Sequence, residues 1–381
     1  MKPRLALITP MHCYVTGGGE ISNQILVKHL VDKADILLVT LVDNNLGCLP
    51  KGVRGVTLNP GVDPDRMLTS IARRLRFGLL PPGLGVITRL LTAYKPDAIL
   101  SLSHYTAGVA SEAARRLGVA YGVVVRASLH PKALIRELGL LKGLVRVGEV
   151  KRVCGYLAGA RRVFTVSRYL YRELAEVCGL DASSIIVDAY DPISEDEIKA
   201  AADAAERLDA IVYIGRLEPY KGVDTLLKAY ARVARGGCNA SLIVAGFGSL
   251  ESLVERVSRL YPRVRYLGRV SHAEALRLMA SSLAVVYPVR HPEPFGRTGM
   301  EAVALGKPLI VSARGGLIEA IAEARRLGVP HYVLRGRGDV EELVEALEWA
   351  CSLDWVKPRP RRVWSMDVER AARRVVEELL D

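Results

Sequence analysis

Short apolar runs alternate with segments of helical periodicity along almost the whole chain of 381 residues. This alternation is typical of doubly wound parallel sheets, in which a helix connects each strand to the next. We expect five strands in the first half and six in the second: Leu5–Ile8, Ile36–Leu41, Ala98–Leu102, Tyr121–Val125, Val163–Val166, Ala210–Ile214, Ser241–Ala245, Val264–Leu267, Leu283–Tyr287, Leu309–Val311 and Tyr332–Leu334. The pattern predicts an α/β protein with two similar domains, since the chain is too long for one ordinary core.

The positive charge is concentrated in the first half. Residues 1–190 contain 25 Lys and Arg against 14 Asp and Glu, a net of +11, which leaves +1 of the total of +12 for the remainder. A basic domain indicates an anionic partner: a phosphorylated acceptor, an anionic membrane face or nucleic acid. A nucleic-acid binder is expected to interleave aromatic residues with basic ones, and aromatics are 6% of the chain. We therefore expect no nucleic-acid partner, and a non-catalytic, basic nucleic-acid-binding α/β protein is kept only as an alternative function.

The six cysteines are scattered, with no CxxC pair and no cluster of His and Cys that resembles a metal site. We interpret them as reduced structural thiols of a cytoplasmic protein without zinc. Gln24 is the only glutamine, which hints at a thermophilic source. No uncharged run is long enough to span a bilayer, and the apolar N-terminus indicates a first strand rather than a signal peptide.

Two glutamates flank a loop and a helix start between Pro292 and Val311. Glu293 is expected on the loop because Pro294 and Gly296 oppose a continuous helix. Glu301 is expected in a first helical turn that runs from Met300 to Leu305, where unpaired backbone N–H groups face a ligand. Such a site suits phosphates and sugar hydroxyls. The alternative is an ordinary strand–loop–helix turn with both glutamates on the surface.

Two cations follow another predicted strand. Arg216 and Lys221 lie in a turn after Ile214, where sites form at the carboxyl ends of parallel strands. Arg binds a phosphate bidentately and Lys supplies a point charge, although a solvated turn with two surface cations remains open. The glycine triplet at 17–19 also follows a strand, but its spacing matches neither the dinucleotide fingerprint nor the Walker loop.

In this order, these elements resemble family 4 of the retaining glycosyltransferases, which have the GT-B fold. The resemblance covers most of the chain and is strongest from Ile211 to Ile321. The matching pieces are Tyr213–Leu217 with Lys221–Gly222, Leu242–Gly248, Tyr266–Val270, the Glu293–Glu301 pair, Gly306–Pro308, and Gly315–Gly316 with Glu319.

The resemblance implies two Rossmann-like domains that face an interdomain cleft. Residues 1–190 with a C-terminal helix at 364–381 would bind the acceptor, 191–208 would be the linker, and 209–357 would bind a nucleoside-diphosphate sugar. The implied reaction transfers the sugar to a glycan or lipid-linked acceptor with retention, and it needs no metal or other cofactor. Another GT-B activity, such as a nucleotide-sugar epimerase, is the alternative, although the Phe295-Gly296 and Glu301-Ala302 contexts argue against it.

The resemblance also implies roles for individual residues. Arg216 and Lys221 would hold the donor diphosphate, Glu301 the ribose hydroxyls, and Glu293 the transferred sugar. The sugar and phosphate pocket would be lined by Phe295, Gly296, Arg297, Thr298 and Gly299, while Val270 would lie near the base through its backbone. Gly18 and Gly19 would approach the phosphates or the acceptor from the other domain.

Two places depart from the family pattern. Many relatives have a histidine near the transferred sugar, and here His130 or His104 is the candidate. Relatives commonly have an Asn-Gly-Val-Asp turn before the interdomain linker, and this chain has Asp188-Ala-Tyr-Asp-Pro192 in its place. Separately, Arg66–Arg89 combines arginines with apolar residues around Pro81-Pro82-Gly83, and it is either a flap against an anionic membrane or a helix packed on the domain.

Overall fold

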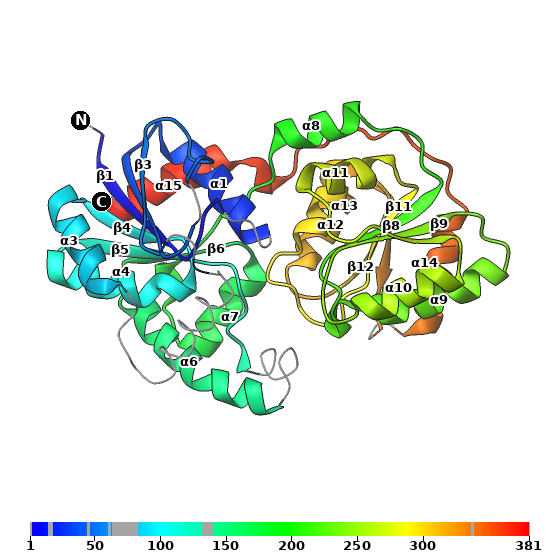
Figure 1. Cartoon of the computed structure of the whole chain (residues 1–381), viewed down its shortest axis with the longest axis horizontal. Coiled ribbons are helices and arrows are strands. Elements are labelled where there is room, and N and C mark those ends of the chain that lie inside the picture. The colour runs from blue at the N-terminus through cyan, green and yellow to red at the C-terminus, as the bar shows by residue number, and fades with distance from the viewer. Residues whose placement is uncertain are drawn as a thin grey trace. The chain divides into compact units, whose positions relative to one another are not determined.

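The computed structural model describes residues 2–13, 18–43, 46–59, 62, 83–131, 140–336 and 339–380, without the side chains of 140–147. Its internal contacts divide the chain into two compact units (Figure 1). The N-terminal unit consists of Met1–Pro192 with Trp364–Asp381, and the C-terminal unit of Ile193–Val363. Residues 191–208, the predicted linker, include helix α8 (Glu195–Asp203), which belongs to the C-terminal unit.

The N-terminal unit is built on a parallel sheet of seven strands in the order β3-β2-β1-β4-β5-β6-β7. Helices α1 and α15 lie on one face of this sheet, and α3, α4, α6 and α7 lie on the other (Figure 1). The strands are β1 (Arg4–Thr9), β2 (Asp35–Thr40), β3 (Val53–Thr57), β4 (Ala98–Ser101), β5 (Ala120–Val125), β6 (Arg162–Thr165) and β7 (Ile185–Val187). The helices are α1 (Gly18–Leu30), α3 (Leu84–Tyr94), α4 (Ala107–Leu117), α6 (Leu140–Ala158), α7 (Arg168–Cys178) and α15 (Val368–Leu380).

The C-terminal unit has a parallel sheet of six strands in the order β10-β9-β8-β11-β12-β13. Helices α9, α10 and α14 cover one face and α11, α12 and α13 the other (Figure 1). The strands are β8 (Ala210–Ile214), β9 (Ser241–Ala245), β10 (Val264–Tyr266), β11 (Ala284–Tyr287), β12 (Leu309–Ser312) and β13 (His331–Leu334). The helices are α9 (Val223–Arg235), α10 (Glu251–Leu260), α11 (His272–Ser281), α12 (Arg297–Ala304), α13 (Leu317–Leu327) and α14 (Val340–Cys351).

All eleven expected strands are present, and the described residues contain two more, at the edges of the first sheet, that the sequence pattern missed. Strand β3 reads Val-Arg-Gly-Val-Thr and is largely accessible, so it lacks an apolar run. Strand β7 has only three residues. Edge strands need apolar residues on fewer sides than central strands do, and their sequence signal is correspondingly weaker.

The apolar-basic segment Arg66–Arg89 lies outside the described residues up to position 82. Gly83 then precedes helix α3 with a left-handed backbone at φ 77°, which a glycine adopts without strain. None of the helices in the described parts of the chain has both the length and the apolar character needed to cross a bilayer.

The cysteines correct the sequence-based interpretation. All six form disulfides, Cys13–Cys48, Cys154–Cys178 and Cys238–Cys351, with Cα–Cα distances of 5.5, 4.9 and 5.7 Å. The prediction of reduced thiols was wrong because the partners are 35, 24 and 113 residues apart and meet only through the tertiary fold. Disulfides persist in oxidising compartments and also inside hyperthermophilic cells. The cysteine spacing therefore does not identify the compartment.

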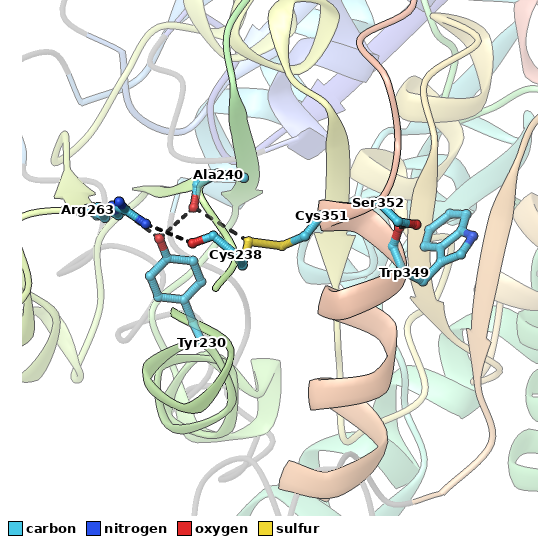
Figure 2. The surroundings of a disulfide bond; sticks show 7 residues. All are labelled: Tyr230, Cys238, Ala240, Arg263, Trp349, Cys351 and Ser352. Atoms are coloured by element: carbon cyan, nitrogen blue, oxygen red, sulfur yellow. Dashed lines mark hydrogen bonds between the residues drawn. A yellow bond between two sulfur atoms is a disulfide. The ribbon is translucent and has the colours of Figure 1, made fainter. Parts of the chain in front are cut away.

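The longest disulfide loop ties together two neighbouring helices of the C-terminal unit. Cys238 lies shortly after the end of α9, and Cys351 is the last residue of α14, which contacts α9. The backbone on the Cys238 side is held further, because the carbonyl of Cys238 accepts from Arg263 Nη1 at 2.8 Å and that of Ala240 accepts from the Tyr230 hydroxyl at 2.7 Å (Figure 2).

Candidate active site

Polar and charged side chains of the C-terminal unit gather where its strands end. Arg216 follows β8, Phe247 follows β9, Arg269 follows β10, and Glu293 follows β11. Because these strands are parallel, their carboxyl ends form one edge of the sheet. The structure therefore places Arg216 and Glu293, both predicted site residues, on the same edge of the sheet.

Lys221 and Glu293 form a buried ion pair. Lys221 is the last residue of a short 3-10 turn at Pro219–Lys221 and is 8% exposed. Its Nζ lies 2.5 Å from Glu293 Oε1 and donates to the Tyr287 hydroxyl at 3.0 Å. Burial opposes the ammonium charge, but Glu293 outweighs it and raises the pKa of Lys221. An ammonium has three N–H donors, so these contacts leave one for a ligand.

Arg216 lies in a more accessible setting. Its side chain is 52% exposed and its guanidinium lies 5.0 Å from the centroid of the Phe247 ring. The guanidinium of Arg269 lies 4.8 Å from the same ring. The aromatic ring thus stabilises two cations by cation–π contact at the ends of neighbouring strands. This concentration of positive charge favours an anion at the sheet edge.

The loop from Glu293 to helix α12 is fixed by backbone contacts. The carbonyl of Glu293 accepts from the N–H of Gly316 at 2.7 Å, and Phe295 is buried. Gly296 has φ 85° and lies next to Leu317, so any side chain at this position would be strained and crowded. Helix α12 begins at Arg297, three residues earlier than predicted, because Gly296 turns the chain directly into the helix.

The earlier helix start changes which residues occupy the first turn. Arg297, Thr298 and Gly299 supply the backbone N–H groups that have no acceptor within the helix. Thr298 Oγ1 also lies 3.5 Å from the carbonyl of Ile214, at the end of β8. Glu301 is consequently one turn deeper than the sequence pattern suggested, in the second turn of α12.

Glu301 is buried at 4% exposure among charged groups. Its Oε1 accepts from Arg297 Nε at 2.7 Å and lies 2.8 Å from His272 Nε2. Burial raises the pKa of Glu301, but Arg297 and His272 outweigh that effect and hold it below its usual value. The predicted pocket residue Arg297 thus contacts Glu301 through its side chain. Val270, the predicted base contact, lies between β10 and Ser271, which caps α11.

The remaining predicted site residues, Gly18, Gly19, His104 and His130, belong to the N-terminal unit. Gly18 and Gly19 are the first residues of α1, while 14–17 lie outside the described residues. The backbone N–H of His130 donates to Ser128 Oγ and to Glu173 Oε1, each at 3.2 Å. His104 begins a 3-10 turn after β4, and the centroid of its ring lies 4.1 Å from that of Tyr105.

The unusual turn at residues 188–192 has a structural explanation. Asp188 is buried, and its carboxylate receives Arg370 Nη2 at 2.7 Å and Arg374 Nη1 at 3.5 Å, both from α15. This turn therefore holds the C-terminal helix on the N-terminal unit.

Sequence reasoning missed two side chains that contact the predicted pair of glutamates. Tyr287 is the last residue of β11 and was treated only as part of an apolar strand. His272 is the first residue of α11, two residues after Val270. A polar group at the carboxyl end of a strand was the available signal for both.

Comparison with known proteins identifies this C-terminal region. Residues 194–363 match the model of the family described as "Glycosyl transferases group 1". This region belongs to that family. A glycogen synthase of Mycobacterium tuberculosis is 33% identical over 196 residues, which cover 46% of this chain and 47% of that protein. A D-inositol 3-phosphate glycosyltransferase of Frankia alni is 30% identical over 267 residues, covering 62% and 61%. The chain thus spans about half to three fifths of the length of these relatives.

Solved structures with low sequence identity show the fold of the whole chain. A sucrose-phosphate synthase from Thermosynechococcus elongatus superposes with a TM-score of 0.71 at 17% identity, covering 99% of this chain and 95% of that one. The Anabaena protein HepE, solved in complex with UDP-glucose, has a TM-score of 0.65 at 19% identity, with coverage of 99% and 95%. The predicted GT-B fold, with two Rossmann-like domains, is confirmed.

Proposed function

We propose that the chain is a glycosyltransferase that moves a sugar from a nucleoside-diphosphate sugar to an acceptor with retention of anomeric configuration. The observation that carries the proposal is the Lys221–Glu293 pair at the carboxyl edge of the C-terminal sheet, with Arg216 in the segment between β8 and Lys221. The family of residues 194–363 supports it, as do glycosyltransferase relatives such as the inositol phosphate enzyme of Frankia alni.

The diphosphate is assigned to the cations and the first turn of α12. Arg216 can chelate phosphate oxygens, and Lys221 has an N–H left after its contacts with Glu293 and Tyr287. The N–H groups at the start of α12, from Arg297 to Gly299, add a partial positive charge. These groups stabilise the negative charge that develops on the leaving nucleotide.

The two glutamates are assigned to hydroxyl groups of the donor. Glu301 Oε1 already has two contacts, so Oε2 is the oxygen for the ribose hydroxyls. Glu293 Oε1 contacts Lys221, which assigns its Oε2 to the transferred sugar. Phe295 and Gly296 shape the intervening loop, and Val270 approaches the base through its backbone.

The acceptor is assigned to the N-terminal unit. Its net charge of +11 over residues 1–190 suits a phosphorylated or otherwise anionic glycan or lipid-linked acceptor. Gly18 and Gly19 open α1 on this unit, and we assign the role of the active-site histidine to His130 or His104. We further infer an intracellular, thermophilic setting, in which disulfides persist, with peripheral contact to an anionic membrane.

A thermal-shift screen with UDP-, GDP- and ADP-sugars tests the proposal. We expect one donor to raise Tm, since a ligand that binds only the folded state stabilises it. NMR of the product with that donor then gives the anomeric configuration. Conversion of the donor sugar without an acceptor would instead indicate an epimerase. Salt-sensitive binding to generic DNA without any response to sugar nucleotides would refute the proposal.

A further inference from the structure

His272 lies between two carboxylates from different helices. Its Nε2 is 2.8 Å from Glu301 Oε1 on α12, and its Nδ1 is 3.6 Å from Glu197 Oε2 on α8. The side chain of His272 is 19% exposed and that of Glu301 is 5% exposed. An imidazole with a carboxylate near each nitrogen is best satisfied when both nitrogens carry protons.

The two carboxylates that face His272 favour its imidazolium form. Glu197 and Glu301 supply two negative charges, while His272 and Arg297 supply two positive ones. Burial lowers the pKa of His272, but the neighbouring carboxylates of Glu197 and Glu301 outweigh burial and raise the pKa to about 9. Strand β8 also packs against α11, and its Val212 and Ile214 lie in an apolar cluster with Leu278 of α11.

Both charged contacts on Glu301 go to the same oxygen. Arg297 Nε lies 2.7 Å from Oε1, and His272 Nε2 lies 2.8 Å from it. Two donors on one oxygen fix the plane of the carboxylate and keep it ionised, so that its second oxygen is oriented as an acceptor. Arg297 comes from the same helix as Glu301, whereas His272 comes from another one and is itself held by Glu197.

We propose that His272 is a positioning residue for the donor nucleotide: its imidazolium holds the Glu301 carboxylate so that Oε2 accepts the ribose hydroxyls. This inference rests on the proposed function, which assigns the ribose to Glu301. It adds His272 as the residue that holds Glu301. His272 follows Val270, the assigned base contact, by two residues. Helix α8 takes part through Glu197, which holds the far side of the imidazolium.

The test compares ribose with dideoxyribose ligands. UDP, GDP and ADP are titrated calorimetrically into the wild-type chain, and the nucleotide that binds is used for all variants together with its 2′,3′-dideoxy form. We expect His272→Ala to weaken binding of the ribonucleotide by about 10-fold to 100-fold, the range for a hydrogen bond between charged groups. For the dideoxynucleotide we expect a loss of less than about 2-fold, because both hydroxyls that would donate to Glu301 are gone.

A second variant keeps the inference testable if the alanine variant unfolds. His272→Gln retains a neutral donor toward Glu301 and should bind more tightly than His272→Ala. The ratio of wild-type to His272→Gln affinity should fall as the pH rises through about 9, where the wild-type imidazolium loses its proton. Taking this ratio cancels any titration of the nucleotide itself. His29→Ala is the matched control, because His29 lies 3.2 Å from Glu369 in the N-terminal unit.

The outcomes separate the two proposals. If none of the nucleotides binds to the wild-type chain, the proposed function falls and this inference falls with it. If a nucleotide binds and His272→Ala leaves its affinity unchanged, only the role of His272 is overturned. An equal loss for the ribonucleotide and the dideoxynucleotide would mean that His272 merely supports the fold, which also overturns its assignment as a positioning residue.

Discussion

Lys221 Nζ lies 2.5 Å from Glu293 Oε1, although the two residues are 72 positions apart in the chain. The pair joins the turn after β8 to the loop after β11, and both side chains are largely buried. Buried charges are stable only when they are paired, because removing a charge from water carries a large desolvation penalty. This ion pair therefore keeps two elements of the candidate active site in register before any ligand binds.

Breaking this ion pair from one side should destabilise the protein. Lys221→Met leaves the Glu293 carboxylate without its cation, and we expect the free energy of unfolding to fall by about 3–5 kcal/mol. Adding Glu293→Gln removes the orphaned charge and should recover part of that loss. Urea unfolding of the single and double variants measures the coupling. Additive losses would show that the two side chains do not stabilise each other.

Two substitutions test the assignment of the donor site. Arg216→Ala and Glu301→Ala should each abolish the thermal shift that the donor causes in the wild-type chain, or the transfer of its sugar. The reason differs, since Arg216 is assigned to the diphosphate and Glu301 to the ribose. Arg115→Ala is a suitable control, because that arginine pairs with Glu112 on a surface helix of the N-terminal unit. Unaltered donor binding and turnover in both site variants would refute the assignment.

A disulfide that closes a longer loop should stabilise the fold more, with a logarithmic dependence on loop length. The separations of 113 and 24 residues for Cys238–Cys351 and Cys154–Cys178 correspond to about 5 and about 3.5 kcal/mol in the chain-entropy model. We expect Cys238→Ser/Cys351→Ser to lower the free energy of unfolding more than Cys154→Ser/Cys178→Ser does. Denaturant unfolding measures both values, and thiol titration of the unfolded wild-type chain without reductant should find none of its six cysteines free.

The burial of His12 should make the folded protein less stable in acid. It is fully buried, and neither ring nitrogen has a hydrogen-bond partner among the described residues. Burial lowers the pKa of His12 to about 4, below the value of 6.5 in the unfolded chain. The unfolded state therefore binds a proton first, and stability present above pH 6.5 is lost as the pH falls through about 4.

The loss attributable to His12 should reach about 3 kcal/mol, because each pKa unit corresponds to about 1.4 kcal/mol. In His12→Leu, the difference between the free energies of unfolding measured at pH 7 and at pH 4 should be smaller than in the wild-type chain. The partly exposed His29 provides the comparison, since His29→Ala should leave that difference in place. An acid dependence that is the same in His12→Leu and in the wild-type chain would contradict the prediction.

The sequence by itself determined the central strands of both sheets and the parallel α/β class, but it missed the edge strands β3 and β7. Buried parallel strands such as β8, β9 and β11 are apolar on both faces, and their runs are visible in any window of the chain. The glycines and cations after these strands also predicted which edge of the second sheet carries charge. This information is local, because turn geometry and strand burial depend on neighbouring residues.

The tertiary structure decided which side chains contact one another in the candidate site. The contact of Lys221 with Glu293 and Tyr287, and that of His272 with Glu301 and Glu197, join different strands and helices. No periodicity encodes which residues meet when the sheet assembles, so Tyr287 appeared only as an apolar strand residue. The same reason explains the cysteines: their spacing suggested free thiols, whereas packing brings Cys238 and Cys351 together across 113 residues. Local pattern fixes the elements, and packing between distant elements fixes the chemistry of the site.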